Sequence, residues 1–272
     1  MQNKPSILVN GSAASHVNIA DRGLLYGDGV FETMAWTGHS IRYFDKHLAR
    51  LERGCQVLGL PMPAKATLTK EIGLLPDLHE PCIIKIILTR GTGGFGYTPA
   101  IPATTPTRIV QRLSTPERSA ADTELRCAVL AMTMGGNRPL AGIKHLNRLE
   151  QVLAAREVAT RGLDEGIICN VDGFVMEAVS SNLLVVFGDR LVTPRLDAGG
   201  VHGILREVLI ERAQARGITV RKEYVYVDTL AEADEIILCN SIRGVRAVKQ
   251  LDDVIFAQRD YFHMLNGLVE FD

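Results

Sequence analysis

One lysine stands in a setting that suits covalent chemistry. Lys144 lies in the segment 140–147, just before a predicted helix, with apolar and small residues on both sides. Most lysines are simply solvated, and that is the plain alternative here. A partly desolvated amine, however, attacks carbonyl groups and then carries protons. Lys144 is therefore the candidate nucleophile.

An anion site is predicted where the chain enters a helix after a glycine turn. Gly199-Gly200 precedes Val201-His202-Gly203-Ile204-Leu205-Arg206. The first backbone N–H groups of that helix therefore lie without helical partners at the positive end of its dipole. Phosphate suits such a site, and a flexible turn that merely starts a helix is the alternative. Ser241, which follows a predicted strand at 235–240, could add a hydroxyl to the same anion.

A lone carboxylate closes a predicted hairpin. Glu177 ends the strand 174–177 after the turn Asp172-Gly173, and the small residues Ala178, Ser180 and Ser181 leave room beside it. The alternative is an exposed carboxylate at a strand end. Together, a lysine amine, a phosphate site and a single carboxylate are what pyridoxal phosphate requires.

The elements that must position these residues alternate between strands and helices, without an internal repeat. Strands are predicted at 6–9, 30–36, 82–89, 107–113, 125–132, 166–171, 174–177, 183–187, 191–193, 218–221 and 235–240. Helices are predicted from Asp45, as the N-terminal cap, to Gly59, and at 67–75, 146–161, 203–216, 229–233 and before Gly267. With a linker at Leu113–Asp122, these elements predict a mixed α+β protein with domains at residues 1–117 and 118–272.

Composition limits the partners and the compartment. The 272 residues include 30 Lys and Arg against 31 Asp and Glu, and a formal net charge of -1 gives no bulk attraction to nucleic acid or membrane. Five cysteines without CxxC spacing predict reduced core thiols. Because the first residues lack the apolar core of a secretory signal, we expect a cytoplasmic protein.

Two other kinds of site are disfavoured. Gly91–Gly96 matches the GxGxxG pattern of dinucleotide-binding proteins, but Pro99 and Pro102 prevent the helix that must follow it, so a flexible loop is predicted. The seven histidines show no metal-binding spacing, so no metal is expected.

Several motifs occur in the order found in the fold-type IV pyridoxal-phosphate enzymes, which the sequence resembles over nearly its whole length. They are Asp21-Arg22-Gly23, Gly27–Glu32, His47–Leu51 and Glu177 with Ser181-Asn182-Leu183. The resemblance implies a small α/β N-terminal domain, a larger C-terminal domain with a β-barrel-like core, pyridoxal 5'-phosphate as cofactor and a homodimer.

The resemblance also implies roles for individual residues. Lys144 would bind the cofactor covalently, and Glu177 would pair with its pyridine nitrogen. The implied phosphate ligands are Arg50, the amides of Ile204 and Leu205, and Ser241, with Val201 against the ring. Without the resemblance, Arg50 would be interpreted as a solvated helix residue.

Two segments are similar to one branch of this superfamily, the aminodeoxychorismate lyases. Residues 137–153 resemble their lysine segment and residues 89–97 their glycine loop, and the aminotransferases differ in both places. The implied reaction converts 4-amino-4-deoxychorismate to 4-aminobenzoate and pyruvate, in folate biosynthesis.

The carboxylate ligands of the substrate are less well marked. D-amino acid aminotransferases bind the substrate carboxylate with tyrosine, arginine and histidine, where this chain has Phe31, Phe95 and Tyr97. Some lyases carry an arginine at the position of Phe95, so Arg108 is the candidate for one substrate carboxylate. The alternatives are a branched-chain or D-amino acid aminotransferase and a non-catalytic dimeric binding protein.

Overall fold

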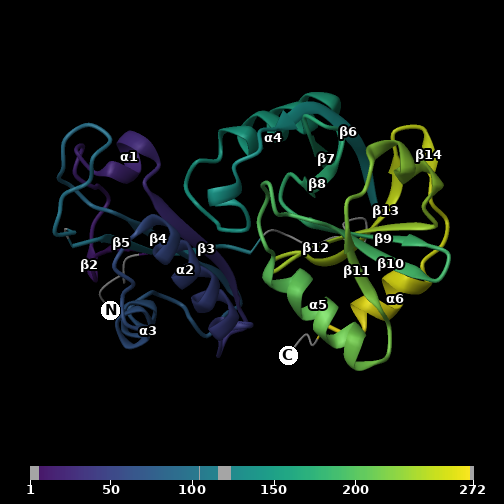
Figure 1. Cartoon of the computed structure of the whole chain (residues 1–272). Helices are drawn as coiled ribbons and strands as arrows, with labels where there is room; N and C mark the ends of the chain where they lie inside the picture. The colour runs from purple at the N-terminus through teal and green to yellow at the C-terminus, as the bar shows by residue number, and fades with distance from the viewer. Residues whose placement is uncertain (1–5, 104, 116–123, 270–272) are drawn as a thin grey trace. The chain divides into compact units, whose positions relative to one another are not determined.

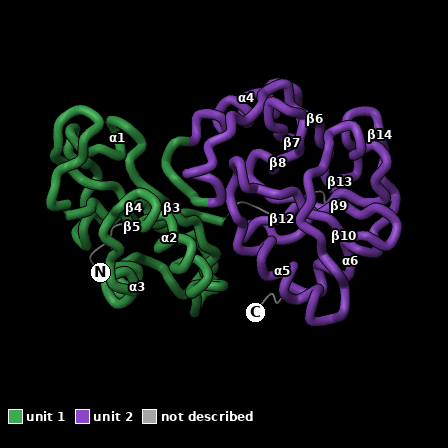
Figure 2. The backbone as a smooth tube through the Cα atoms, in the orientation of Figure 1, with its two compact units in different colours: residues 1–116, 143–147 green, residues 117–142, 148–272 purple. Residues whose placement is uncertain are grey.

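A computed structural model describes residues 6–103, 105–115 and 124–269. By its internal contacts the chain forms two compact units, coloured green and purple in Figure 2. The first unit comprises residues 1–116 with 143–147, and the second comprises 117–142 with 148–272. The predicted domain boundary at 117/118 and most of the predicted linker Leu113–Asp122 lie outside the described residues.

The first unit is built on a five-stranded antiparallel sheet of order β2-β1-β5-β4-β3 (Figure 1). Its strands are β1 (Ile7–Val9), β2 (Ser12–Ala13), β3 (Gly29–Trp36), β4 (Cys82–Thr89) and β5 (Thr107–Leu113). Its helices are α1 (Arg22–Tyr26), α2 (Phe44–Leu58) and α3 (Lys65–Gly73). The predicted bounds of β4 and β5 are confirmed. Both strands contain several β-branched residues, which favour extended structure.

The two faces of this sheet differ. Val30 of β3 pairs with Leu88 of β4, and both pack with Leu51 of α2 in a buried core. The alternate residues form the other face, which we call the second face and which is mostly half-buried. It includes Phe31, Thr33, Ile83, Lys85, Ile87, Ile109 and Gln111.

The outer edge of β3 is extended by a segment from much later in the sequence. The Phe31 amide donates to the Lys144 carbonyl at 2.9 Å, and the Leu146 amide donates to the Gly29 carbonyl at 2.9 Å. Because residues 144–146 are extended against β3, the helix predicted at 146–161 begins only at Leu149, as α4 (Leu149–Arg161). The prediction was wrong at this end.

The described part of the second unit contains a nine-stranded mixed sheet of order β11-β10-β9-β12-β13-β6-β7-β8, with β14 paired to β13. The strands are β6 (Glu124–Met134), β7 (Glu165–Asn170), β8 (Val175–Ala178), β9 (Asn182–Phe187), β10 (Arg190–Pro194), β11 (Val220–Glu223), β12 (Glu235–Asn240), β13 (Gly244–Leu251) and β14 (Val254–Ile255). The helical segments are η2 (Arg138–Leu140), α4, α5 (Ile204–Ala215), η3 (Val227–Glu232) and α6 (Asp260–Asn266).

This sheet curls around an apolar core. The Val175 amide of β8 donates to the carbonyl of Val225, just past β11, and the Val227 amide donates to the carbonyl of Gly173. These bonds join the two ends of the strand order, and apolar side chains such as Leu183 and Val248 fill the interior. The expected α+β fold with a barrel-like C-terminal core is confirmed.

Other expectations need correction. Asp45 does not cap α2, because the cap position is Tyr43 in a left-handed conformation, and Asp45 lies in the first turn and binds Lys65. The segment predicted as a helix at 229–233 is the 3-10 segment η3. None of the helices that the structure describes is long and apolar enough to cross a membrane.

Candidate active site

Lys144 is held beside an aromatic ring of the first unit. Its carbonyl accepts from the Phe31 amide, so the two residues are opposite one another across the edge of β3. Residues paired in this way have their side chains on the same face of a sheet. Accordingly, Lys144 Nζ lies 4.5 Å from the centroid of the Phe31 ring. This setting differs from that of an ordinary solvated lysine.

Arg50 lies on α2 and is only 5% exposed. Its Nε and Nη2 donate to the two carboxylate oxygens of Glu32 on β3, at 2.7 and 2.6 Å, and His47 Nδ1 lies 2.6 Å from the same carboxylate. Burial alone would raise the pKa of Glu32, but Arg50 and His47 lower it to about 2. Arg50 is therefore a rigidly held cation rather than a solvated helix residue, and its phosphate role stays a prediction.

Glu177 of the second unit is a buried carboxylate on β8, 5% exposed. One of its oxygens accepts from the Val201 amide at 2.8 Å, and the other lies 3.4 Å from Gln151 Nε2 of α4. The alternative of an exposed carboxylate at a strand end is therefore wrong. Two donors fix the orientation of this side chain, which suits a group that must face a ring nitrogen.

The N-terminus of α5 has the features of an anion site. Gly203 is its cap residue and no side chain that the structure describes caps the helix. The first amide to donate within the helix is that of Glu207, to the Gly203 carbonyl at 3.0 Å. The amides of Ile204 and Leu205 precede it, so they have no partner in the helix. They can receive a phosphate at the positive end of the helix dipole.

Ser241 follows β12 in a turn whose shape is set by the preceding residue. Asn240 Oδ1 accepts from the amides of Ile242 and Arg243, at 3.0 and 2.6 Å. These bonds hold the backbone around Ser241, and the role of its hydroxyl as a phosphate ligand stays a prediction.

Arg108, the predicted substrate ligand, lies on β5 in the row of Val30 and Leu88. That row belongs to the face covered by helices, and the Arg108 guanidinium donates to the buried Glu71 of α3, at 3.0 and 2.7 Å. The structure does not bring Arg108 to the second face, where Lys144 lies.

The amino-transferase class IV family profile matches residues 29–251. The chain belongs to the class IV aminotransferase family.

Relatives within this family cover almost the entire chain. An aminodeoxychorismate lyase of Vibrio harveyi is 33% identical, over 88% of this chain and 89% of that protein. The crystal structure of 4-amino-4-deoxychorismate lyase from Pseudomonas aeruginosa is 37% identical with a TM-score of 0.91, and the match covers 96% of this chain and 97% of that one. A putative branched-chain-amino-acid aminotransferase of Methanocaldococcus jannaschii is 28% identical, over 93% and 89% of the two chains.

In this class IV chain, both backbone groups of Val201 make hydrogen bonds to side chains. Its amide donates to Glu177, and its carbonyl accepts from Asn182 Nδ2 at 2.9 Å. Asn182 Oδ1 would lie 1.8 Å from a Cβ at Gly203, so only glycine fits at that cap position. Sequence reasoning missed this role of Asn182, although the family motif at 181–183 contained the residue.

A backbone clamp connects the lysine segment with the turn before α5. The Gly142 amide donates to the Gly200 carbonyl, and the His202 amide donates to the Gly142 carbonyl, both at 3.0 Å. Gly142 has a φ of +79°, and a Cβ there would lie 2.7 Å from the His202 ring. Two residues before Lys144, the chain is therefore fixed to the turn that leads to the anion site.

Arg206 of α5 is a second residue that sequence reasoning missed. It is buried, and its guanidinium donates to two neutral oxygens, Thr193 Oγ1 at 2.7 Å and the Pro194 carbonyl at 2.8 Å. Burial lowers its pKa. Because no carboxylate binds it directly among these contacts, Arg206 adds positive potential to the first turn of α5.

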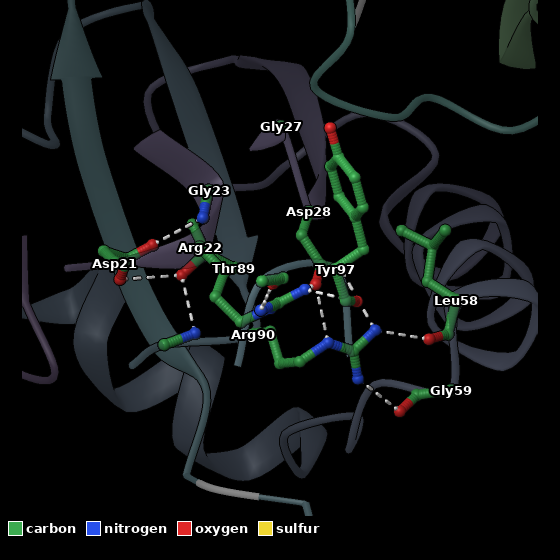
Figure 3. A network of polar contacts seen from close by, with 12 residues as sticks. Asp21, Arg22, Gly23, Gly27, Asp28, Leu58, Gly59, Thr89, Arg90 and Tyr97 are labelled. Carbon is green, nitrogen blue, oxygen red and sulfur yellow. Dashed lines mark hydrogen bonds and ion pairs between the residues drawn. The ribbon is translucent and has the colours of Figure 1, made fainter. Parts of the chain in front are cut away.

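The glycine loop after β4 is anchored by the network in Figure 3. Arg22 donates to the carbonyls of Gly96 and Tyr97, at 2.8 and 2.9 Å, and to Asp28 at 3.0 Å. Arg90 also binds Asp28, and the carbonyls of Leu58 and Gly59 at the end of α2. Burial would raise the pKa of Asp28, but the two arginines lower it. This ionised network fixes Arg90 at the start of the loop and the carbonyls of Gly96 and Tyr97 at its end.

Among the residues that the structure describes, no group of three or more histidine, cysteine, aspartate or glutamate side chains could hold a metal ion.

Proposed function

We propose that this protein is a pyridoxal-phosphate-dependent lyase that converts 4-amino-4-deoxychorismate to 4-aminobenzoate and pyruvate, a step of folate biosynthesis. The observation that carries the proposal is the likeness to proteins named as this lyase, at 33 and 37% identity over most of the chain. The buried Glu177, the uncapped α5 and the lysine over Phe31 supply groups that this chemistry needs.

The residues present fit the cofactor of the family. Lys144 would bind it covalently, and Glu177 would pair with the pyridine nitrogen while Val201 lies against the ring. The phosphate would be held by Arg50, Ser241 and the amides of Ile204 and Leu205. When bound, pyridoxal phosphate supplies an electron sink for the carbanion that forms when the substrate loses a proton.

Side chains of this protein would move the protons of the reaction and orient the reacting groups. With its amine free, Lys144 would remove the proton from C4 of the substrate. Loss of that proton allows the neighbouring ether bond to break, so the enolpyruvyl group departs and becomes pyruvate after protonation, and the ring becomes aromatic. Glu177 would favour the protonated form of the pyridine nitrogen, and the Val201 amide and Gln151 hold the carboxylate in place for this.

An aminotransferase is the second candidate, because a relative so named is 28% identical. An aminotransferase would share the proton removal by Lys144 and would differ in the substrate. Phe31 lacks the hydroxyl of the tyrosine that D-amino acid aminotransferases have at this position, which disfavours a D-alanine site.

The test compares the two reactions on the purified holoenzyme. Aminodeoxychorismate should yield pyruvate and 4-aminobenzoate, whereas amino acids with 2-oxoglutarate should give no transfer; transfer without lyase activity would refute the proposal. Lys144→Ala should lose both the activity and the visible absorption of the lysine-bound cofactor, and Lys70→Ala on α3 serves as a control that keeps both. A colourless wild type would instead favour a non-catalytic binding protein.

We further propose that the protein is a cytoplasmic homodimer that binds neither nucleic acid nor membrane. The five cysteines are free and buried, which agrees with a reducing compartment.

A further inference from the structure

A second lysine shares the aromatic ring beside Lys144. Lys85 Nζ lies 5.5 Å from the centroid of the Phe31 ring, and Lys144 Nζ lies 4.5 Å from the same centroid. The two ammonium nitrogens therefore cannot be farther apart than these two distances added together. One small substrate can reach both of them.

The strand register explains why these groups meet. Lys85 of β4 pairs with Thr33 of β3, two residues along from Phe31, and Lys144 is opposite Phe31 on the other side of β3. Residues that pair directly, or that are two apart on a strand, share a face. Lys85, Phe31 and Lys144 therefore all belong to the second face, and their placement depends on paired strands rather than on a flexible loop.

Lys85 has a charge that the described residues do not neutralise. Across residues 6–103, 105–115 and 124–269, its ammonium makes no ion pair, and its recorded interaction is that with the Phe31 ring. Its neighbours on the second face are Thr33, Gln111 and the apolar Ile83 and Ile87. A half-buried cation that shares the Phe31 ring with the Lys144 ammonium, and has no acidic residue among these neighbours, favours an anion as its partner.

Arg108 offers a contrast on the same sheet. Its guanidinium already binds the carboxylate of Glu71, and it lies on the face covered by helices. A substrate carboxylate at Arg108 would have to compete with a buried acid, whereas at Lys85 it would meet no such competitor among the described side chains.

We propose that Lys85 binds the ring carboxylate of the substrate. This inference rests on the proposed function, since it places the amine of aminodeoxychorismate at Lys144. The amine and the ring carboxylate are at opposite ends of a six-membered ring, which suits two separate cations on one face. 4-Aminobenzoate keeps this carboxylate, so Lys85 binds the product as well as the substrate and selects ligands that carry the acid.

The test uses Lys85→Met, which removes the charge and keeps the length of the side chain. With holoenzyme and calorimetry, the affinity for 4-aminobenzoate should fall about 10- to 100-fold, the range expected for a lost hydrogen bond to a charged group. The affinity for aniline, which lacks the carboxylate, should not change. KM for aminodeoxychorismate should rise by a similar factor with kcat within a few-fold, and Lys85→Arg should retain most of the affinity.

Arg108→Met is the matched comparison. It should leave the affinity for 4-aminobenzoate unchanged, and visible absorption and thermal melting would confirm that both variants fold and hold the cofactor. If Arg108→Met loses the affinity and Lys85→Met keeps it, the proposal is overturned. A wild type without preference for 4-aminobenzoate over aniline overturns it too.

The calorimetry also separates this inference from the proposed function. A wild type that does not cleave aminodeoxychorismate refutes the lyase reaction, yet the comparison of 4-aminobenzoate with aniline still decides whether Lys85 binds a carboxylate.

Discussion

Glu32 is a fully buried carboxylate that stays ionised because two basic side chains surround it. Arg50 donates to both of its oxygens and His47 contacts one of them. Its pKa of about 2 lies below the ordinary 4.5. A carboxylate with a lowered pKa stabilises the folded state fully above its unfolded pKa, and this contribution declines as the pH falls from about 4.5 to about 2.

Arg50→Met should destabilise the protein through Glu32. At neutral pH the variant leaves a buried charge without its main partner, so the free energy of unfolding should fall by about 3–5 kcal/mol. The difference from wild type should narrow as the pH falls from about 4.5 to about 2, because there the wild type loses the benefit of the ionised Glu32. Urea unfolding followed by circular dichroism across this range measures both effects.

The double variant Glu32→Gln/Arg50→Met is the control for this experiment. It removes the charge together with its partner, so it should be more stable at neutral pH than Arg50→Met alone. Equal stability of the two variants would mean that the buried charge is not the cause of the loss.

At the scale of elements, the sequence predicted most strands of the two sheets but missed one central strand, β13. β4, β5 and β12 have the predicted bounds. β13 escaped prediction although it lies inside the sheet, because its Arg246 is charged yet buried, which requires a partner. In the structure Arg246 is neutralised by Glu165 at 3.2 Å, a contact between distant residues that no local pattern indicates.

The groups of the candidate site were predictable only in part, for a related reason. Lys144, Glu177 and the start of α5 stood out by residue type and local setting. The partners Gln151 and Asn182 did not, because their contacts join separate elements. The family motif indicated Arg50. Its pairing with Glu32 connects a helix to a strand, so the spacing of the two residues in the sequence does not predict it.

Two glycine-to-alanine variants test whether the backbone clamp between Gly142 and the turn before α5 positions Lys144. Gly142→Ala adds a Cβ at a positive φ and against the His202 ring, so it should displace the chain that carries Lys144. We expect kcat of the proposed lyase to fall about 10- to 100-fold, since displacement of a catalytic group by about 1 Å can have this effect.

Gly162→Ala provides the comparison, because Gly162 also has a positive φ, of +62°, but no atom near its added Cβ. It should reduce stability by about 1 kcal/mol, the strain of a left-handed alanine, and leave kcat within a few-fold. Equal kcat values for the two variants would show that the contact with His202 is unimportant for Lys144.

At the scale of the whole chain, one short segment makes the organisation discontinuous. Residues 143–147 belong to the first unit by their contacts, although the chain on both sides of them belongs to the second (Figure 2). A single division of the sequence cannot express this arrangement. It follows from the pairing of residues 144–146 with β3, which puts Lys144, the candidate nucleophile, on the sheet of the first unit.

The proposed homodimer has a candidate surface on the first unit. Leu25 of α1 is 53% exposed, and Phe95 and Tyr97 of the glycine loop are 91 and 88% exposed. Tyr26 contacts the Tyr97 ring, and Arg22 binds the loop backbone, so α1 and the loop form one apolar surface. Single exposed apolar residues are common, but a group of them is typical of an interface.

Leu25→Glu should therefore weaken the dimer, because it places a charge in a surface that association would desolvate. Analytical ultracentrifugation should show a dimeric wild type and a shift of Leu25→Glu toward monomer at the same concentration. Val57→Glu on α2 is the control, since Val57 is similarly exposed, at 50%, but lies outside this surface. A monomeric wild type would refute the dimer, and equal dissociation of both variants would show that the interface is not at α1 and the glycine loop.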